Sequence, residues 1–196
     1  MSRGKLIAIE GIDKSGKTTL ARILARKLSS KGLKVVVTYE PWHPKITEVI
    51  NEATSKGVDG EVETLLFAAD RLLHVRRLIQ PALERGEWVI TDRYVYSSIA
   101  YQTARGADRR WVEEVNKYAV KPDLTILLDI DPELSLGRKG GNRLQGLEKI
   151  EYLESIRRAY LELAKEYGFL VLDARMDTES LSERVMMFLR EKGWIR

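Results

Sequence analysis

Short apolar segments alternate along the chain with longer stretches in which apolar residues recur every three or four positions. The apolar segments, rich in Val, Ile and Leu, lie at residues 5–10, 33–39, 88–91, 124–130 and 169–174. Uninterrupted runs of this kind are typical of parallel strands that are covered on both faces. Helical spacing begins at Thr18 and recurs at about 62–85, 95–104, 108–119, 147–167 and 178–192. The pattern predicts an α/β fold with a doubly wound, five-stranded parallel sheet and helices on both faces.

Composition narrows the possible classes of protein. The 196 residues suffice for one core, and we expect a single domain over residues 1–196. The sequence has no cysteine, which excludes a disulfide framework, a thiolate zinc site and a cysteine nucleophile, and with two histidines an oxygen-bound Mg²⁺ is the favoured metal. No run of about 18 apolar residues is present, so we expect a cytoplasmic protein without a membrane span. The net charge of +4 comes from interspersed acidic and basic residues, so nucleic acid is not an expected partner.

A glycine-rich segment follows the first predicted strand and opens the first predicted helix. Residues 11–18, GIDKSGKT, match G-x-x-x-x-G-K-[ST] at every fixed position. Backbone N–H groups of such a turn can converge on the oxygens of a polyphosphate, while Lys17 reaches the β and γ phosphates and the Thr18 hydroxyl coordinates Mg²⁺. The expected ATP-binding residues are Gly11, Ile12, Asp13, Lys14, Ser15, Gly16, Lys17, Thr18 and Thr19.

A second polar cluster follows the third predicted strand and identifies an acceptor. Residues 91–102 read TDRYVYSSIAYQ, and their polar side chains recur at three- and four-residue steps, so that many can face one cleft. This segment resembles the signature of the thymidylate kinase family. The resemblance extends from the phosphate loop through TLLFAADR and LLDIDPELSLGRK to EKIEYLESIRRAYLELAKEYG. It implies Mg²⁺-dependent transfer of a phosphoryl group from ATP to thymidylate, in nucleotide biosynthesis, by a homodimer.

The same resemblance assigns roles to individual residues. Arg93 would hold the acceptor phosphate, since a guanidinium can donate two parallel hydrogen bonds to it, and Asp92 would lie near the Mg²⁺. Phe67 would stack on thymine, and Arg71 would hydrogen-bond a base carbonyl. The remaining expected substrate-binding residues are Ser98 and Gln102 at the base, Tyr101 in the space of a ribose 2′-hydroxyl, Asp13 with Glu148 at the 3′-hydroxyl, and Glu40 and Pro41 on the sugar side.

The segment of residues 138–146, RKGGNRLQG, lacks periodicity and resembles the lid that closes over ATP in nucleotide kinases. Arg138 and Arg143 are its candidates for stabilising charge on the transferring phosphoryl group. Members of the family use either lid arginines or a basic residue in the phosphate loop for this purpose. Lys14 occupies the second of these places, so the sequence leaves both options open.

Several residues also have a purely structural interpretation. Phe67 has helical spacing with apolar neighbours and suits a core position, and Asp70 with Arg71 suits an exposed charge pair. Asp129 ends a strand and competes with Asp92 as the carboxylate near Mg²⁺, although the resemblance favours Asp92. His43 and His74 are interpreted as structural. The alternative functions are phosphorylation of another nucleoside monophosphate and a non-catalytic, nucleotide-binding regulatory module.

Overall fold

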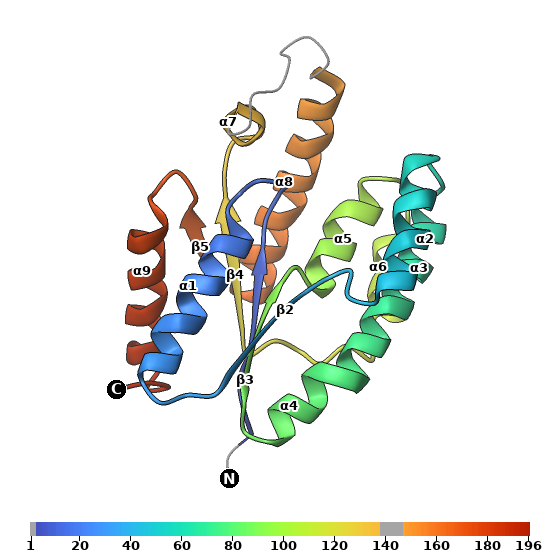
Figure 1. The fold of residues 1–196 in the computed structure, drawn as a ribbon. Coiled ribbons are helices and arrows are strands. Elements are labelled where there is room, and N and C mark those ends of the chain that lie inside the picture. The colour runs from blue at the N-terminus through green and yellow to red at the C-terminus, as the bar shows by residue number, and fades with distance from the viewer. Residues whose placement is uncertain (1–2, 138–146) are drawn as a thin grey trace.

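The computed structural model describes residues 3–137 and 147–196, without the side chains of residues 147 and 148. Its strands form one parallel sheet in the order β2-β3-β1-β4-β5 (Figure 1). The strands are β1 (Leu6–Glu10), β2 (Val35–Tyr39), β3 (Trp88–Asp92), β4 (Leu124–Asp129) and β5 (Leu170–Asp173). The five-stranded parallel sheet predicted from the apolar runs is therefore confirmed.

Helices cover both faces of this sheet. They are α1 (Lys17–Ser30), α2 (Pro44–Ser55), α3 (Gly60–His74), the π-helix η1 (Val75–Ile79), α4 (Gln80–Glu84), α5 (Val95–Thr103), α6 (Arg109–Val115), α7 (Pro132–Gly137), α8 (Leu147–Tyr167) and α9 (Thr178–Glu191). Figure 1 shows α1 and α9 on one side of the sheet and the continuous helix from α3 to α4 on the other.

Side chains of the central strand β1 contribute to two buried apolar clusters. Ile7 and Ile9 belong to a buried cluster with Leu24 of α1, whereas Leu6 and Ala8 pack with residues of η1, α4 and β3. Successive side chains of a strand point to opposite faces, so two covered faces require an unbroken apolar run. All five residues of β1 are buried, as this arrangement demands.

The predicted helix at 62–85 is continuous in the structure but contains the π-helical segment η1 just ahead of Pro81. Proline has no N–H, and its ring clashes with the carbonyl four residues earlier in a regular α-helix. A π-turn is one of the recognised ways in which a helix accommodates such a defect. The long periodic stretch was therefore correctly predicted as helical, while its internal change of geometry was not.

Two helices have no counterpart among the predictions. Helix α2 has apolar residues at helical spacing, at Ile46, Val49, Ile50 and Ala53, although Ile50 alone among its residues is buried; this stripe was missed from the sequence. Helix α7 is a short turn directly after β4. Predicted helix 108–119 ends earlier than expected, at Val115.

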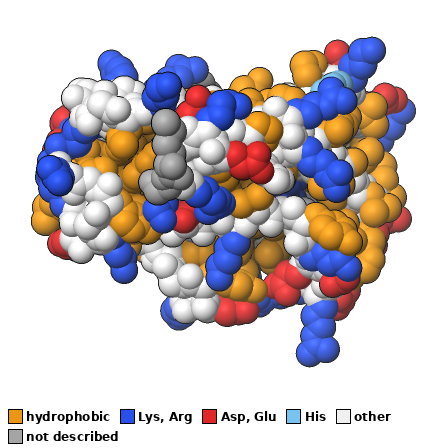
Figure 2. All heavy atoms as spheres, turned by 90° about the horizontal axis from the view of Figure 1, so that it is seen from below, with side chains coloured by type: hydrophobic (Ala, Val, Ile, Leu, Met, Phe, Trp, Pro, Cys, Tyr) orange, Lys and Arg blue, Asp and Glu red, His pale blue; other side chains and the backbone are white. Residues whose placement is uncertain are grey.

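The carboxyl ends of the strands form the edge where the predicted chemistry lies. β1 sits between β3 and β4, and the chain leaves it toward α1 while β3 leads into α5. Ligands in open parallel sheets bind at such a point, where neighbouring connections diverge. On the opposite, lower face, Lys and Arg side chains are scattered among acidic and apolar ones (Figure 2).

Candidate active site

The glycine-rich loop connects β1 to α1 through backbone conformations that few residues adopt. Gly16 is the N-cap of α1 with φ 104°, and Lys14 also has a left-handed φ of 60°. A β-carbon on Gly11 would lie 2.6 Å from the carbonyl oxygen of Leu128, so this glycine is required for packing against β4. The first hydrogen bond of α1 runs from Leu20 N to Gly16 O at 3.0 Å. The first amides of a helix have no acceptor within the helix, so this end of α1 is suited to binding an anion.

The Lys17 side chain is buried inside this loop. Its Nζ donates to the carbonyl oxygens of Gly11 at 3.1 Å and Ile12 at 2.8 Å, and it lies 3.4 Å from Ser15 Oγ. Burial lowers the pKa of Lys17 to about 7, and the positive charge of Arg93 lowers it as well. An anion bound at the loop would favour the charged form of this lysine.

Arg93 stands at the end of β3, directly beside the loop. It has a left-handed φ of 69°, and its backbone N–H donates to Ile9 O at 2.9 Å. Its guanidinium contacts Asp13 Oδ1 at 2.6 Å, Ser97 Oγ at 3.2 Å and Tyr101 Oη at 3.2 Å. Because Asp13 belongs to the loop, the two predicted phosphate-binding elements are in direct contact.

Asp92 and Thr18 are also brought together. The Thr18 hydroxyl donates to Asp92 Oδ2, which joins the start of α1 to the end of β3. Within residues 3–137 and 147–196, no three His, Asp or Glu side chains form a group able to hold a metal ion. The oxygen atoms of Thr18 and Asp92 fit a Mg²⁺ that takes its other ligands from phosphate and water.

Asp129, the competing carboxylate, has another partner. Arg157 of α8 donates to both of its oxygens, at 2.7 and 3.1 Å. This bidentate pair ties α8 to the end of β4. Asp129 is therefore engaged in a fixed ion pair, which agrees with the preference for Asp92.

Arg71 lies in a buried polar cluster, and its interpretation as part of an exposed pair with Asp70 is wrong. It is 2% exposed, and its Nε lies 2.8 Å and its Nη2 2.7 Å from Glu40 Oε2. Nη1 donates to Ser98 Oγ at 3.0 Å and to Asn116 Oδ1, and Nη2 donates to Tyr94 O at 3.2 Å. Every nitrogen of the guanidinium thus has a protein partner.

Asp70 instead fixes the segment after β2. Its two oxygens accept from the backbone N–H groups of Trp42 at 2.6 Å and His43 at 2.7 Å, just beyond the cis peptide bond between Glu40 and Pro41. Asp70 is 1% exposed, because the segment covers it. Glu40 and Pro41 are thereby held next to α3.

His74 belongs to a polar network that links α3 to β2 and the segment after it. Its Nδ1 lies 3.1 Å from Glu40 Oε1, its Nε2 lies 2.8 Å from Thr38 Oγ1, and the Trp42 ring stacks on it at 5.3 Å. The sequence interpretation missed this network because its members come from β2, the following segment and α3. The Trp42 ring covers this histidine.

The other residues predicted to bind the phosphoryl acceptor come from α3 and α5. Phe67 is half-buried and belongs to neither buried apolar cluster, which weakens its interpretation as core. Tyr101 has its ring 4.9 Å from the Arg93 guanidinium. Gln102 is buried, donates to Glu63 Oε2 at 3.4 Å, and has a buried Oε1 without a hydrogen-bond partner among the described residues.

Three predicted side chains lie outside the described residues, and two others are exposed. Arg138 and Arg143, with the whole predicted lid at 138–146, lie outside the described residues, as does the side chain of Glu148. Lys14 is exposed, and its Nζ lies 3.5 Å from Leu136 O. Thr19 is exposed in the first turn of α1.

The comparisons with known proteins agree with this geometry. The family model for thymidylate kinase matches residues 9–185. The chain belongs to the thymidylate kinase family. A protein named probable thymidylate kinase from Staphylothermus marinus is 41% identical over 192 residues, covering 97% of this chain and 96% of that protein. Relatives with similar names in Saccharolobus solfataricus and Archaeoglobus fulgidus are 44% and 45% identical, covering 95% and 92% of this chain and 97% and 92% of their own lengths.

One buried residue of the site was missed from the sequence. Glu10, the last residue of β1, is fully buried and accepts hydrogen bonds from the start of α5. The signal was present: a carboxylate closes an otherwise apolar strand immediately before the glycine loop. Buried carboxylates are rare unless they have partners, so a glutamate at this position indicates a hydrogen-bonded carboxylate in the site.

No helix in the described ranges is long and apolar enough to cross a membrane.

Proposed function

We propose that this protein, acting as one domain over residues 1–196, transfers the γ-phosphoryl group of ATP to thymidylate to give thymidine diphosphate, for nucleotide biosynthesis. The contact between Arg93 and Asp13, at 2.6 Å, carries the proposal. It joins a guanidinium suited to a monophosphate to the loop suited to a polyphosphate. Phosphates held by these two elements would meet end to end, which phosphoryl transfer requires.

The reaction needs charge neutralisation more than covalent chemistry. Backbone amides of the loop and Lys17 would bind the ATP phosphates, and Arg93 would bind the acceptor phosphate. Mg²⁺, when bound, would neutralise the donor phosphates, with the Thr18 hydroxyl and Asp92 as its nearest protein groups. Lys14 and the arginines at 138 and 143 remain the candidates for assisting transfer.

Arg71 would recognise the thymine base by giving up one hydrogen bond to the protein and forming one to a carbonyl of the base. All of its nitrogens already have partners, so a base carbonyl must replace one of them, and Ser98 Oγ at 3.0 Å is a neutral partner that can move. Phe67 would stack on the base, and Gln102 has an acceptor available. Tyr101, held beside Arg93, would fill the space of a ribose 2′-hydroxyl.

The adenine of ATP would lie at the ends of β4 and β5. A cavity of about 370 Å³ there is lined by side chains that include Asp129, Leu134, Arg157 and Arg175. Asp173 at the end of β5 and Arg175 just beyond it also line this cavity. This placement puts the base on the opposite side of the loop from Arg93.

A panel of nucleoside monophosphates with Mg-ATP, scored by ADP formation, tests the proposal. Thymidylate should give the highest kcat/KM, and Lys17→Ala should lower turnover by roughly 100-fold or more, since it removes a cation from the transferring phosphates. Another preferred monophosphate would support a different acceptor. Nucleotide binding without acceptor-dependent ADP release would support a regulatory module instead.

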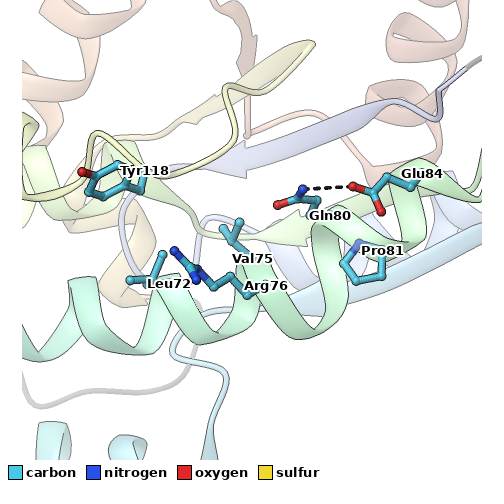
Figure 3. Close-up of a pocket in the computed structure, with 7 residues that line it drawn as sticks. All are labelled: Leu72, Val75, Arg76, Gln80, Pro81, Glu84 and Tyr118. Carbon is cyan, nitrogen blue, oxygen red and sulfur yellow. Dashed lines mark hydrogen bonds between the residues drawn. The ribbon is translucent and has the colours of Figure 1, made fainter.

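We also propose that the protein is a cytoplasmic homodimer, as the family resemblance implies. Val62 and Leu65 of α3 and Tyr118 after α6 are exposed apolar side chains. Tyr118 also lines a cavity of about 490 Å³, together with Leu72, Val75, Arg76, Gln80, Pro81 and Glu84 (Figure 3). Sedimentation should give a dimer that Leu65→Glu dissociates and that Met187→Glu, an exposed position on α9, leaves intact. A monomeric wild-type protein would refute the dimer.

A further inference from the structure

Glu10 links the phosphate loop to the acceptor side of the site. It is the last residue of β1, next to Gly11, and it is fully buried. Its Oε1 accepts from the backbone N–H groups of Tyr94 at 3.0 Å and Ser97 at 3.2 Å. Its Oε2 accepts from the hydroxyl groups of Ser97 at 2.6 Å and Tyr160 at 3.0 Å. Both carboxylate oxygens are thus used as acceptors, as in an ionised group.

The first of these contacts caps helix α5 from a distant strand. Tyr94 is the N-cap of α5, and no side chain within the helix caps it. The first amides of a helix lack intrahelical partners, and a neighbouring Ser, Thr, Asp or Asn usually supplies the acceptor. Here Glu10 supplies it, and a negative charge is favourable at this end of a helix. The start of α5 is therefore tied to the strand that begins the loop.

The second contact connects Glu10 to Arg93 through the hydroxyl group of Ser97. Ser97 Oγ has a single proton, and the charged carboxylate of Glu10 at 2.6 Å is a stronger acceptor for it than Tyr160 Oη at 2.8 Å, which donates its own proton to Glu10 Oε2. The lone pairs of Ser97 Oγ then face Arg93 Nη1, which donates to it at 3.2 Å. Ionised Glu10 thereby sets the direction of the hydroxyl that orients the guanidinium.

The charge of Glu10 is costly to bury. Burial raises the pKa of Glu10 to about 7, while hydrogen bonds from Ser97 and Tyr160 and the charge of Arg93 act in the opposite direction. An apolar residue at this position would pack in the core without that cost. The carboxylate is therefore better explained by the groups it orients than by stability.

We propose that Glu10 is a positioning residue: it fixes the Arg93 guanidinium relative to the phosphate loop by capping α5 and by orienting the Ser97 hydroxyl. The inference rests on the proposed function, because Arg93 matters here as the holder of the acceptor phosphate. It assigns Glu10 no contact with either substrate.

Glu10→Gln tests the inference with little change in size. The amide oxygen can still cap α5, but the amide nitrogen would donate to Ser97 Oγ. The hydroxyl can then no longer donate to residue 10, and its proton must turn toward Tyr160 Oη, 2.8 Å away, or toward Arg93. At about pH 8, where Glu10 is ionised in the wild type, KM for thymidylate should rise about tenfold because an oriented, charge-assisted hydrogen bond is lost. KM for ATP should stay within about twofold, since Lys17 and the loop amides are unchanged.

Ser97→Ala supplies a second route to the same link. It removes the hydroxyl while Glu10 continues to accept both backbone N–H groups, so KM for thymidylate should again rise selectively. The double variant should be no worse than Ser97→Ala, because both changes break one path. Glu114→Gln, which removes an exposed carboxylate of α6, serves as the charge control and should change neither KM.

The outcomes separate this inference from the proposed function. A wild-type protein without thymidylate-dependent ADP formation would defeat the function itself. An active wild type whose Glu10→Gln and Ser97→Ala variants keep the wild-type KM for thymidylate, or raise both KM values equally, would overturn the positioning role alone. If Glu10→Gln does not fold, Ser97→Ala decides between them by the same two constants.

Discussion

Replacing Glu40 with Gln leaves the guanidinium of Arg71 without its carboxylate. The two side chains are each 3% exposed, and Glu40 Oε2 lies 2.7 Å from Arg71 Nη2. The other partners of Arg71 are the neutral oxygens of Ser98, Asn116 and Tyr94. The carboxamide oxygen can face Arg71, but it carries no charge to balance the buried cation.

The expected loss is large because the pair is removed from water. Breaking a buried ion pair from one side costs about 3–5 kcal/mol, since the remaining charge stays desolvated. For a chain of this length a loss of 1 kcal/mol lowers the melting temperature by roughly 2–4 °C. We therefore expect Glu40→Gln to lower the melting temperature by roughly 6–20 °C.

Urea unfolding followed by circular dichroism measures this loss directly. The matched control is Glu52→Gln, whose carboxylate is 65% exposed and pairs with Lys56 at 2.6 Å on the surface of α2. That pair should contribute under about 1 kcal/mol. The double variant Glu40→Gln/Arg71→Met should recover part of the stability, because it removes the uncompensated cation as well. A loss below about 1 kcal/mol in Glu40→Gln would refute the argument that Arg71 depends on this one carboxylate.

Three further predictions concern other charged groups. Burial raises the pKa of Glu10 to about 7 from 4.5, so the folded protein binds that proton more tightly than the unfolded chain does. The free energy of unfolding of the wild type, relative to that of Glu10→Gln, should therefore fall by about 3 kcal/mol as pH rises from about 4.5 to about 7. Urea unfolding at both pH values measures this change, and a difference between the two proteins that does not depend on pH would contradict the prediction. The groups that act on this carboxyl, Arg93, Arg71, Ser97 and Tyr160, are present in both proteins, whereas the nearby Lys17, whose pKa burial lowers to about 7, begins to lose its proton at the upper end of this pH range. Asp177 caps α9 by accepting from Ser180 N at 2.9 Å, so Asp177→Ala should cost about 1 kcal/mol in urea unfolding and Asp177→Asn much less. Asp92→Asn should raise the Mg²⁺ concentration needed for half-maximal ADP formation, and an unchanged requirement would exclude Asp92 from the metal site.

The fold was largely predictable because its three central strands, β1, β3 and β4, are buried on both faces. The run at 124–130 became β4 at Leu124–Asp129, and each of the other runs also overlaps a strand, within two residues at either end. Such segments need apolar residues at every position, and this requirement is visible in the sequence alone. Helix α2 was missed although its apolar residues recur at helical spacing from Ile46 to Ala53, and Ile50 alone among its residues is buried. Its N-terminus carries Pro44 at a position that suits a helix start.

The site was predictable where its chemistry is local in sequence. The loop from Gly11 to Thr18 and the pair Asp92 and Arg93 each occupy one short segment, and they lie where the strand order predicts. The cluster around Arg71 is different, because Glu40 and Asn116 reach it from segments 31 and 45 residues away. Spacing rules describe one helix or strand at a time, so they treated Asp70 and Arg71 as surface neighbours.

Buried charge distinguishes this edge of the sheet from the rest of the core. Glu10, Lys17, Glu40, Asp70 and Arg71 are each at most 6% exposed, and they lie at the ends of β1 and β2, in the first turn of α1 and on the facing helix α3. Removing an ion from water costs several kcal/mol, and apolar residues of similar volume often stabilise a fold as well or better. Stability alone therefore does not account for five such residues at one edge. They are accounted for if each fixes a group that must meet a phosphate or a base in one orientation, because a preorganised polar site does not have to rearrange when charge moves during transfer.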